Sequence, residues 1–294
     1  MPAPPRSRLA ADAPDVRTAY GGTMSVSSVR GGQGTADLRA CGLALFDYLL
    51  MNLLLLHESD LIDGGAGALV SGRRATHLLD VVGVEVGSTV AAGLLGGRMG
   101  QGVVVALVET TLTLELRLDR DPPPRLDVRL VLALPRPKCL RRIVQGCAAM
   151  GLRDLHLINS WRVEKSYWGS PLLETGRLRD EMILGAEQGR DTILPDVRLH
   201  KGFKPFVEDL LPAIGGATLK LVGDLSATLG CPASVAAPVT LVIGPEGGLI
   251  PYEVEMLVRA GFEPVSLGPR ALRVEHAVPA FLGRLAPGDA ASRS

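Results

Sequence analysis

Two glycine-rich turns, each at the end of an apolar run, place the strongest constraint on how this chain can fold. The run at residues 241–243 stops at Gly244-Pro-Glu-Gly-Gly248, and the run at residues 264–267 stops at Gly268-Pro-Arg270. The turns lie about one strand–helix–strand unit apart, so both can open at the same edge of a parallel sheet. Because open α/β sheets bind ligands at that edge, we expect a ligand site there.

The rest of the C-terminal half also predicts an α/β domain with a mainly parallel sheet. Residues 126–134 are largely apolar, which predicts a strand buried on both faces. A helix with an apolar face at Leu140, Ile143, Val144 and Cys147 follows, and Gly151 ends it. Further strands are predicted at 154–159, 219–223, 239–243 and 264–267, and further helices at 172–188, from Pro251 to Gly261 with Val254, Leu257 and Val258 buried, and at 271–285.

Residues 51–120 have a different pattern, which predicts a small β-barrel. Strands are expected at 53–56, 68–71, 89–95, 103–108 and 111–118, separated by glycine-rich or polar turns. The stretch Asp121-Pro-Pro-Pro-Arg125 is a stiff linker and the expected domain boundary, with the α/β domain at 126–287 and a tail at 288–294. Residues 1–50 are rich in Ala, Gly, Pro, Ser and Arg, which predicts a disordered extension, or sequence upstream of a true start at Met51.

Composition narrows the class of protein. Among the 294 residues, 31 basic side chains balance 31 acidic ones, so no global basic field indicates a nucleic-acid partner. The four cysteines are scattered and form no C-x-x-C pair, which argues against a zinc site or a disulfide framework. No apolar stretch approaches the roughly 20 residues that a membrane span needs. We therefore expect a cytoplasmic protein without a metal or a membrane anchor.

The two glycine-rich turns contain the residues best suited to bind a ligand. Glycines let main-chain N–H and C=O groups approach a ligand closely, although a turn without a ligand explains the first motif equally well. In the second motif, Arg270 and Arg273 can hold a phosphate or a developing negative charge, whereas a surface ion pair between Arg273 and Glu275 is the plainer reading. The G-x-G-x-x-G fingerprint of nicotinamide enzymes and the P-loop are both absent.

Taken together, the motifs resemble a known family. Ile243-Gly-Pro-Glu-Gly-Gly-Leu249, followed by Leu267-Gly-Pro-Arg-Ala-Leu-Arg-Val-Glu275, resembles the C-terminal signature of the RsmE family, the 16S ribosomal RNA (uracil-N3) methyltransferases of the SPOUT superfamily. His77-Leu78 and Glu187-Gln188 also resemble family segments. The resemblance implies a PUA-like barrel before a trefoil-knotted α/β domain. It also implies S-adenosylmethionine as methyl donor, a homodimer, and a uridine of 16S rRNA on the 30S subunit as the target.

The resemblance also implies roles for residues. Arg273 and Glu275 become the catalytic candidates, with His276 as a further candidate base that is more ordinarily structural. Cofactor binding is expected from the first loop, at Ile243, Gly244, Pro245, Glu246, Gly247 and Gly248, and from the second, at Leu267, Gly268 and Leu272. The candidate RNA-binding cations are Arg136, Lys138, Arg142, Arg162, Arg190 and Arg270. Trp161, Tyr167 and Trp168 form a stacking platform for a base or, equally, a partly buried apolar edge.

Some positions depart from the family pattern and leave alternatives open. Where the family continues Leu-Arg-Thr-Glu-Thr-Ala, this chain has Val274 and His276 in place of the two threonines, and Pro279 is expected to interrupt the helix. Ala149-Met-Gly151 replaces the family's Glu-Leu-Gly. The alternatives are a SPOUT methyltransferase that acts on another RNA site, and an RNA-binding relative without turnover.

Overall fold

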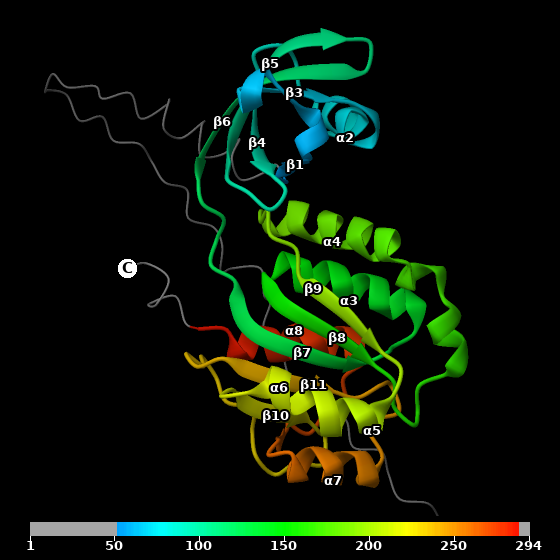
Figure 1. Cartoon of the computed structure of the whole chain (residues 1–294). Helices are drawn as coiled ribbons and strands as arrows, with labels where there is room; N and C mark the ends of the chain where they lie inside the picture. The colour runs from blue at the N-terminus through cyan, green and yellow to red at the C-terminus, as the bar shows by residue number, and fades with distance from the viewer. Residues whose placement is uncertain (1–51, 288–294) are drawn as a thin grey trace, which may run out of the picture. The chain divides into compact units, whose positions relative to one another are not determined.

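The computed structural model of the protein describes residues 52–287. The expectations for residues 1–50, for a start at Met51 and for a tail at 288–294 lie outside this part. Two six-stranded sheets organise the described chain (Figure 1). The proline stretch joins them, since the last strand of the first sheet ends at Arg120 and the first strand of the second begins at Leu126. No helix within residues 52–287 is long and apolar enough to cross a membrane.

The N-terminal sheet is a curled, mixed half-barrel with the strand order β1-β4-β5-β6-β3-β2. Its strands are β1 (Leu54–Leu56), β2 (Leu61–Ile62), β3 (Gly67–Val70), β4 (Thr89–Leu94), β5 (Met99–Val108) and β6 (Thr111–Arg120). Only β1 and β4 pair in parallel; the other pairs are antiparallel. Burial alternates along much of β5 and β6, as it does in strands with one face in the core.

The N-terminal prediction missed a helical segment, which lies between β3 and β4. It consists of α2 (Gly72–His77) and a π-helical turn at Leu78–Val82. Ala75 and Leu78 are buried, and Val82 packs against the same core. Those positions follow the i, i+3, i+7 spacing of an amphipathic helix, which the short glycine-bounded stretch concealed. Two 3-10 turns, at Glu58–Asp60 and Asp63–Gly65, were also missed.

The C-terminal sheet is entirely parallel and has the order β12-β10-β11-β7-β8-β9. Its strands are β7 (Leu126–Ala133), β8 (Leu152–Ile158), β9 (Asp196–His200), β10 (Leu219–Gly223), β11 (Val239–Ile243) and β12 (Glu263–Val265). All five residues of β11 are buried, as its central position requires. The sheet confirms the α/β prediction, β9 excepted, which was not predicted. The trefoil knot stays a prediction from the resemblance.

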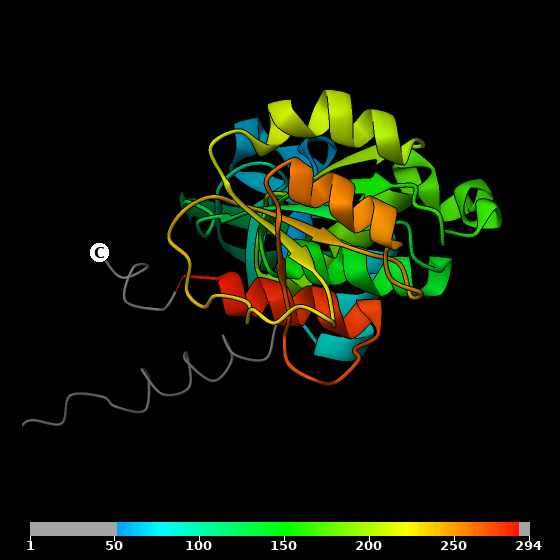
Figure 2. The ribbon, with the colours of Figure 1, turned by 90° about the horizontal axis from the view of Figure 1, so that it is seen from below.

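Helices cover both faces of this sheet, and Figure 2 shows α8 and the α5–α6 segment on opposite sides of it. The helices are α3 (Pro137–Ala149), α4 (Thr175–Gly189), α5 (Phe203–Pro205), α6 (Leu211–Gly215), α7 (Pro251–Arg259) and α8 (Val274–Leu285). Short 3-10 turns occupy Lys165–Gly169 and Pro171–Leu173, and a π-helical turn at Phe206–Leu210 links α5 to α6.

Three details of the helix predictions need correction. First, α4 begins at Thr175 and α8 at Val274, each three residues later than expected. Second, Val258 was assigned to the buried face of α7, but its side chain is 46% exposed, and Met256 is buried instead. Third, Pro279 lies inside α8 without ending it. Proline removes one N–H from a helix, and this helix continues past that missing bond to Leu285.

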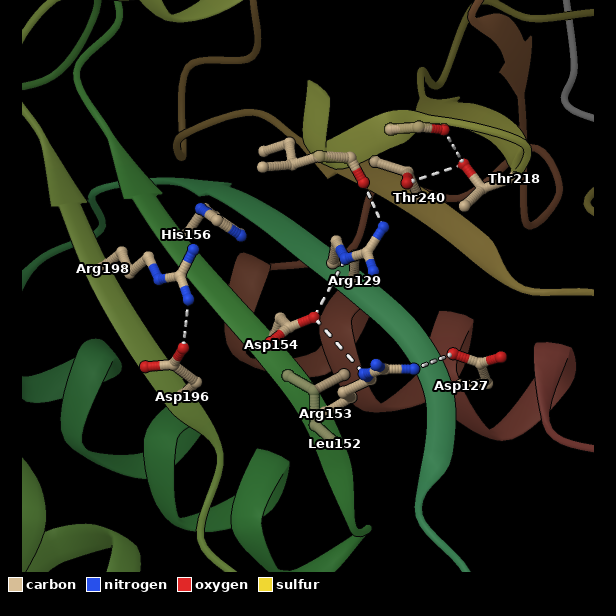
Figure 3. Close-up of polar contacts among 12 residues, drawn as sticks. Asp127, Arg129, Leu152, Arg153, Asp154, His156, Asp196, Arg198, Thr218 and Thr240 are labelled. Atoms are coloured by element: carbon tan, nitrogen blue, oxygen red, sulfur yellow. Dashed lines mark hydrogen bonds and ion pairs between the residues drawn. The ribbon is translucent and has the colours of Figure 1, made fainter. Parts of the chain in front are cut away.

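A polar network lies on the sheet face that the α5–α6 segment covers (Figure 3). Arg129 of β7 donates to Asp154 of β8 at 2.9 Å and to the main-chain oxygen of Ile214. Beside this pair, His156 is 2% exposed, and its Nδ1 lies 3.0 Å from Nε2 of His200. The His200 ring centroid lies 4.7 Å from that of Phe206 in the covering segment. Each polar group on this face thus meets a partner across strands or from the covering segment.

Candidate active site

A cavity of about 400 Å³ lies where β10, β11 and β12 end. Its walls come from three loops that follow these strands, and α8 closes the remaining side. The lining residues are Gly223, Asp224, Leu225, Ile243, Gly244, Pro245, Glu246, Gly247, Gly248, Leu249, Val254, Val265, Ser266, Leu267, Gly268, Arg270, Ala271, Leu272, Val274, Ala277 and Phe281. This is the edge of the sheet that the two glycine-rich turns indicated.

The loop after β11 is a tight turn that only glycine permits. A Cβ at Gly244 would lie 3.0 Å from the main-chain nitrogen of Leu249, a contact so tight that a side chain would push the main chain of the turn aside. Gly248 adopts φ 73°, in the left-handed region, and its N–H donates to the oxygen of Pro245 at 2.7 Å. The loop therefore presents its main chain to the cavity.

Two carboxylates fasten this loop to its neighbours. Glu246 accepts a hydrogen bond from the main-chain N–H of Arg136, at the start of α3, at 3.1 Å. Glu253 is only 3% exposed and accepts from the N–H groups of Ile250 and Trp161, at 3.0 and 2.8 Å. Sequence reasoning did not single out Glu253. The sequence did contain a signal for it: Glu253 is the third residue of α7, where a capping box places an acidic residue.

The loop after β12 has a similar character. Gly268 has φ +117°, a conformation that L side chains rarely adopt. Its N–H donates to Ser266 Oγ at 3.1 Å, and the Ser266 hydroxyl donates to the Gly268 oxygen at 3.0 Å. All nine residues predicted to bind the cofactor, from this loop and the previous one, line the same cavity. Their binding role itself stays a prediction.

The third loop, after β10, was missed. Gly223, Asp224 and Leu225 line the cavity, and Asp224 Oδ1 accepts from the N–H and the hydroxyl of Ser226 at 2.8 Å each. An apolar strand that ends in Gly-Asp was the signal in the sequence, because it places a carboxylate at the same sheet edge.

The two catalytic candidates flank the cavity rather than line it. Arg273 is exposed at the position preceding α8 and forms no ion pair within residues 52–287, so the surface pair with Glu275 is absent. Glu275, whose side chain is 10% exposed, lies 3.4 Å from Arg142 Nη1 and 3.9 Å from His276 Nε2. A hydrogen bond from the Cys139 thiol, with help from the Arg142 charge, lowers the pKa of the Glu275 carboxyl. Glu275 is accordingly a carboxylate at neutral pH.

Comparison with known proteins gives this geometry a context. The model of a family described as "RNA methyltransferase domain" matches residues 122–286. Two relatives named ribosomal RNA small subunit methyltransferase E are each 28% identical: one from Treponema pallidum, over 77% of this chain and 87% of its own length, and one from Mycobacterium bovis, over 79% and 91%. The chain belongs to the RsmE family. The resemblance that the motifs indicated is thereby confirmed.

Solved structures agree on the fold. The ribosomal RNA small subunit methyltransferase E of Neisseria gonorrhoeae, determined with bound S-adenosyl methionine, aligns with a TM-score of 0.62. The alignment covers 79% of this chain and 95% of that one at 20% identity. The half-barrel followed by a parallel α/β domain is therefore the RsmE architecture.

The cations proposed for RNA contact in this RsmE-family chain fall into two groups. One group lies near the cavity and consists of Arg136 and Arg142 on the α3 segment, Arg162, and Arg270. Arg162 donates to the oxygen of Gly247, and Arg270 lines the cavity itself. Lys138 is exposed near the start of α3, and Arg190 lies at the far end of α4. Of the six, Arg270 thus lines the cavity, Arg136 and Arg162 contact lining residues, and Arg142 contacts Glu275 beside it.

The aromatic residues divide in the same way. Trp161 is 80% exposed, next to Arg162 and the first glycine loop. Tyr167 and Trp168 pack against the core, and Trp168 Nε1 donates to Asn159 at 2.9 Å. A stacking platform of three rings does not form, which leaves Trp161 as the exposed aromatic residue of this set.

Proposed function

We propose that this protein transfers a methyl group from S-adenosylmethionine to N3 of a uridine in 16S rRNA. Membership of the RsmE family supports the reaction class and the RNA. The observation that carries the proposal is the cavity at the ends of β10, β11 and β12, because it gathers every residue expected to hold the methyl donor.

The cavity suits S-adenosylmethionine in size and in chemistry. Its volume of about 400 Å³ lies within the range of roughly 300–1,000 Å³ for small-molecule sites. Main-chain groups of the two glycine loops can hydrogen-bond an adenine edge, and the Asp224 carboxylate can accept from hydroxyl groups. Apolar side chains at Ile243, Leu272 and Phe281 complete the walls.

Methyl transfer to N3 requires the loss of a proton. The N3–H bond breaks, the N3 electron pair forms a bond with the methyl carbon, and the carbon–sulfur bond breaks with its electrons on sulfur. The chain must hold N3 in line with the methyl group, and such positioning supplies on the order of 7–11 kcal/mol of the barrier reduction. The exposed Arg273 guanidinium, beside the cavity, is placed to stabilise negative charge on O2 or O4.

Two groups next to Arg273 can accept the proton. Glu275 is ionised, but its lowered pKa makes it a weak base, and its contact with Arg142 fits a role in positioning that arginine. His276, with a side chain 67% exposed, lies beside it and can accept a proton while its imidazole is neutral. The Glu275→Gln and His276→Ala variants separate the two roles by their pH–rate profiles.

The RNA meets the chain at the rim of the cavity. Arg136, Arg142, Arg162 and Arg270 lie around the rim, and the exposed Trp161 ring offers a stacking surface for an unpaired base. We further infer that the substrate is the assembled 30S subunit in the cytoplasm and that two copies of the chain form a homodimer, both on the family resemblance. Light scattering tests the dimer by measuring twice the chain mass.

The deciding experiment uses labelled S-adenosylmethionine and 30S subunits that lack N3-methyluridine, with the product nucleoside identified by mass. Labelled N3-methyluridine is the expected product. A different labelled nucleoside would indicate a SPOUT enzyme with another RNA site. Cofactor binding without transfer to 30S subunits or naked rRNA would leave an RNA-binding relative without turnover.

A further inference from the structure

A second cavity of about 330 Å³ lies between the N-terminal segment and the α3–α4 pair. It is separate from the first cavity, since the two share no lining residue. The lining residues are Asn52, Leu53, Leu54, Arg73, Arg74, His77, Leu78, Val82, Gln145, Leu184, Glu187 and Gln188. The proposed methyl transfer assigns no role to this cavity.

The cavity explains two motifs that the first site leaves unused. His77-Leu78 on α2 and Glu187-Gln188 on α4 are far apart in the sequence, yet all four residues line this one space. A packed junction holds the two segments together. The N–H of Leu53 donates to the oxygen of Glu187 at 2.9 Å, and a separate apolar cluster joins Leu53, Leu55 and Met99 to Ile183 and Ala186.

The floor of the cavity is equally well defined. A Cβ at Gly185 or Gly189 of α4 would collide with the main chain of α3, at Gln145 and Ala149. The two helices therefore approach at main-chain distance, which brings Gln145 beside Leu184 and Gln188. Gln145 Nε2 donates to Glu181 at 2.6 Å, which leaves the amide oxygen of Gln145 available as an acceptor.

The two arginines of the cavity differ in their freedom. Arg74 is held by Asp60, at 2.5 and 2.8 Å, and by the oxygen of Leu55 at 2.9 Å, so it is part of the framework. Arg73 is 59% exposed and pairs with Glu187 at 3.2 Å. The Glu187 side chain is 13% exposed and also feels the charge of Arg74, so the exposed Arg73 guanidinium can turn to a phosphate while Glu187 keeps a neighbouring cation.

The lining suits a nucleotide: it has apolar walls at Leu78, Val82 and Leu184, amide groups at Gln145 and Gln188, and the exposed guanidinium of Arg73, which pairs with Glu187. Asn and Gln amides read base edges, and splayed RNA bases are bound in such pockets. Resting on the proposed function, we propose that this second cavity binds one nucleotide of the rRNA, splayed out near the target, with Gln188 on the base and Arg73 on its phosphate.

The test compares Arg73→Ala and Gln188→Leu with two matched controls from the half-barrel. Arg117 is exposed and has one carboxylate partner, as Arg73 does, and Gln101 is an exposed glutamine; neither residue lines the first or the second cavity. Methyl transfer to unmodified 30S subunits gives kcat and KM, and calorimetry gives the Kd for S-adenosylmethionine. Each cavity variant should raise the KM for 30S subunits about tenfold, with kcat and the cofactor Kd unchanged.

Salt dependence separates the two contacts. Arg73→Ala should reduce the slope of log Kd for a 16S rRNA fragment against log salt by roughly 0.7–0.9, the loss of one phosphate contact. Gln188→Leu should leave that slope unchanged. The idea fails if both variants match the Arg117→Ala and Gln101→Leu controls in KM. Failure of the proposed function gives a different result, since the wild-type protein would then transfer no methyl group to 30S subunits.

Discussion

The carboxyl edge of the parallel sheet and the polar face of the same sheet show two uses of polar residues. At the edge, the candidate residues are exposed or half-exposed, and glycine loops present main-chain groups to a cavity. On the face, Arg129, Asp154 and His156 are partly or fully buried and satisfied by one another or by the covering segment. A ligand can therefore reach the polar groups at the edge of the sheet, whereas the covering segment shields those on the face.

This difference teaches that a perturbed pKa alone does not locate the chemistry. Burial, with help from the charge of His200, lowers the pKa of His156 to about 4, one of the large shifts in residues 52–287. Perturbed groups are often functional, yet this histidine lines neither cavity. If the distinction is correct, substitutions at the edge should mainly change methyl transfer. Substitutions on the polar face should mainly change the stability of the fold.

The largest effect is expected at the edge, for Arg273→Ala. Loss of a cation that stabilises charge in the transition state should lower kcat by about 10²–10³-fold. The Kd for S-adenosylmethionine and the unfolding midpoint should stay at the wild-type values, because Arg273 does not line the cofactor cavity and forms no ion pair within residues 52–287. Arg259→Ala on α7 is the control, because it removes another exposed arginine that does not line the cavity. Undiminished turnover would remove Arg273 from the mechanism.

The next largest effect is expected on the polar face of the sheet, where His156 should make the free energy of unfolding depend on pH. His156 binds a proton more readily in the unfolded chain, where its pKa is near 6.5, than in the fold, where it is about 4. The unfolded state therefore takes up more protons as the pH falls through this window, so stability is complete above the unfolded pKa and is lost below it. Urea unfolding should show a loss of roughly 2 kcal/mol from this residue between about pH 7.5 and about pH 5.

His156→Phe tests the assignment, because a phenyl ring keeps the contact with Phe206 and does not titrate. The variant should lose most of that pH dependence and keep the wild-type kcat and KM. An equal pH dependence in wild type and variant would show that other groups cause it, and a fall in kcat would remove the distinction between edge and face.

A smaller effect is expected at the edge of the sheet, where two glycine substitutions distinguish the influence of main-chain conformation from that of steric crowding. Neither Gly268 nor Gly230 has an atom within 4 Å of a Cβ position, but only Gly268 has a positive φ, +117°. Gly268→Ala should strain the loop and weaken S-adenosylmethionine binding about tenfold, since such a conformation costs on the order of 1–3 kcal/mol for a side chain. Gly230→Ala should have no such effect. Equal calorimetric Kd values for the two variants would mean that the loop does not shape the cofactor site.

The same contrast explains which features could be predicted from the sequence. The strands β10 and β11 were predicted to the residue, because their apolar runs end at glycine turns. Glycine and proline also mark main-chain loops, so all nine predicted cofactor residues line one cavity. By contrast, β9 and the α5–α6 segment were missed, because β9 alternates charged and apolar residues at a sheet edge and Pro205 and Pro212 interrupt the helical spacing.

Side-chain partnerships could not be predicted for a further reason. Glu253 accepts a hydrogen bond from Trp161, which is distant in the sequence. Asp224 accepts from Ser226 in a loop that has no glycine–proline motif to draw attention to it. The second cavity depends on contacts between α2 and α4 that only the packed fold defines. A resemblance marked His77 and Glu187 as notable, and the fold was needed to place them together.

The smallest effect is expected where this chain departs from the family pattern. His276→Thr restores the family residue at a site whose side chain is 67% exposed, and it removes only a 3.9 Å contact with Glu275. That contact is long and the histidine is well exposed, so kcat near neutral pH should change less than about threefold if Glu275 or water takes the proton. If His276 is instead the base, kcat should fall far more, and the acidic limb of the pH–rate profile should disappear with the imidazole. That outcome would move the proton acceptor from the Glu275 carboxylate to the His276 imidazole, a position where this chain departs from the family pattern.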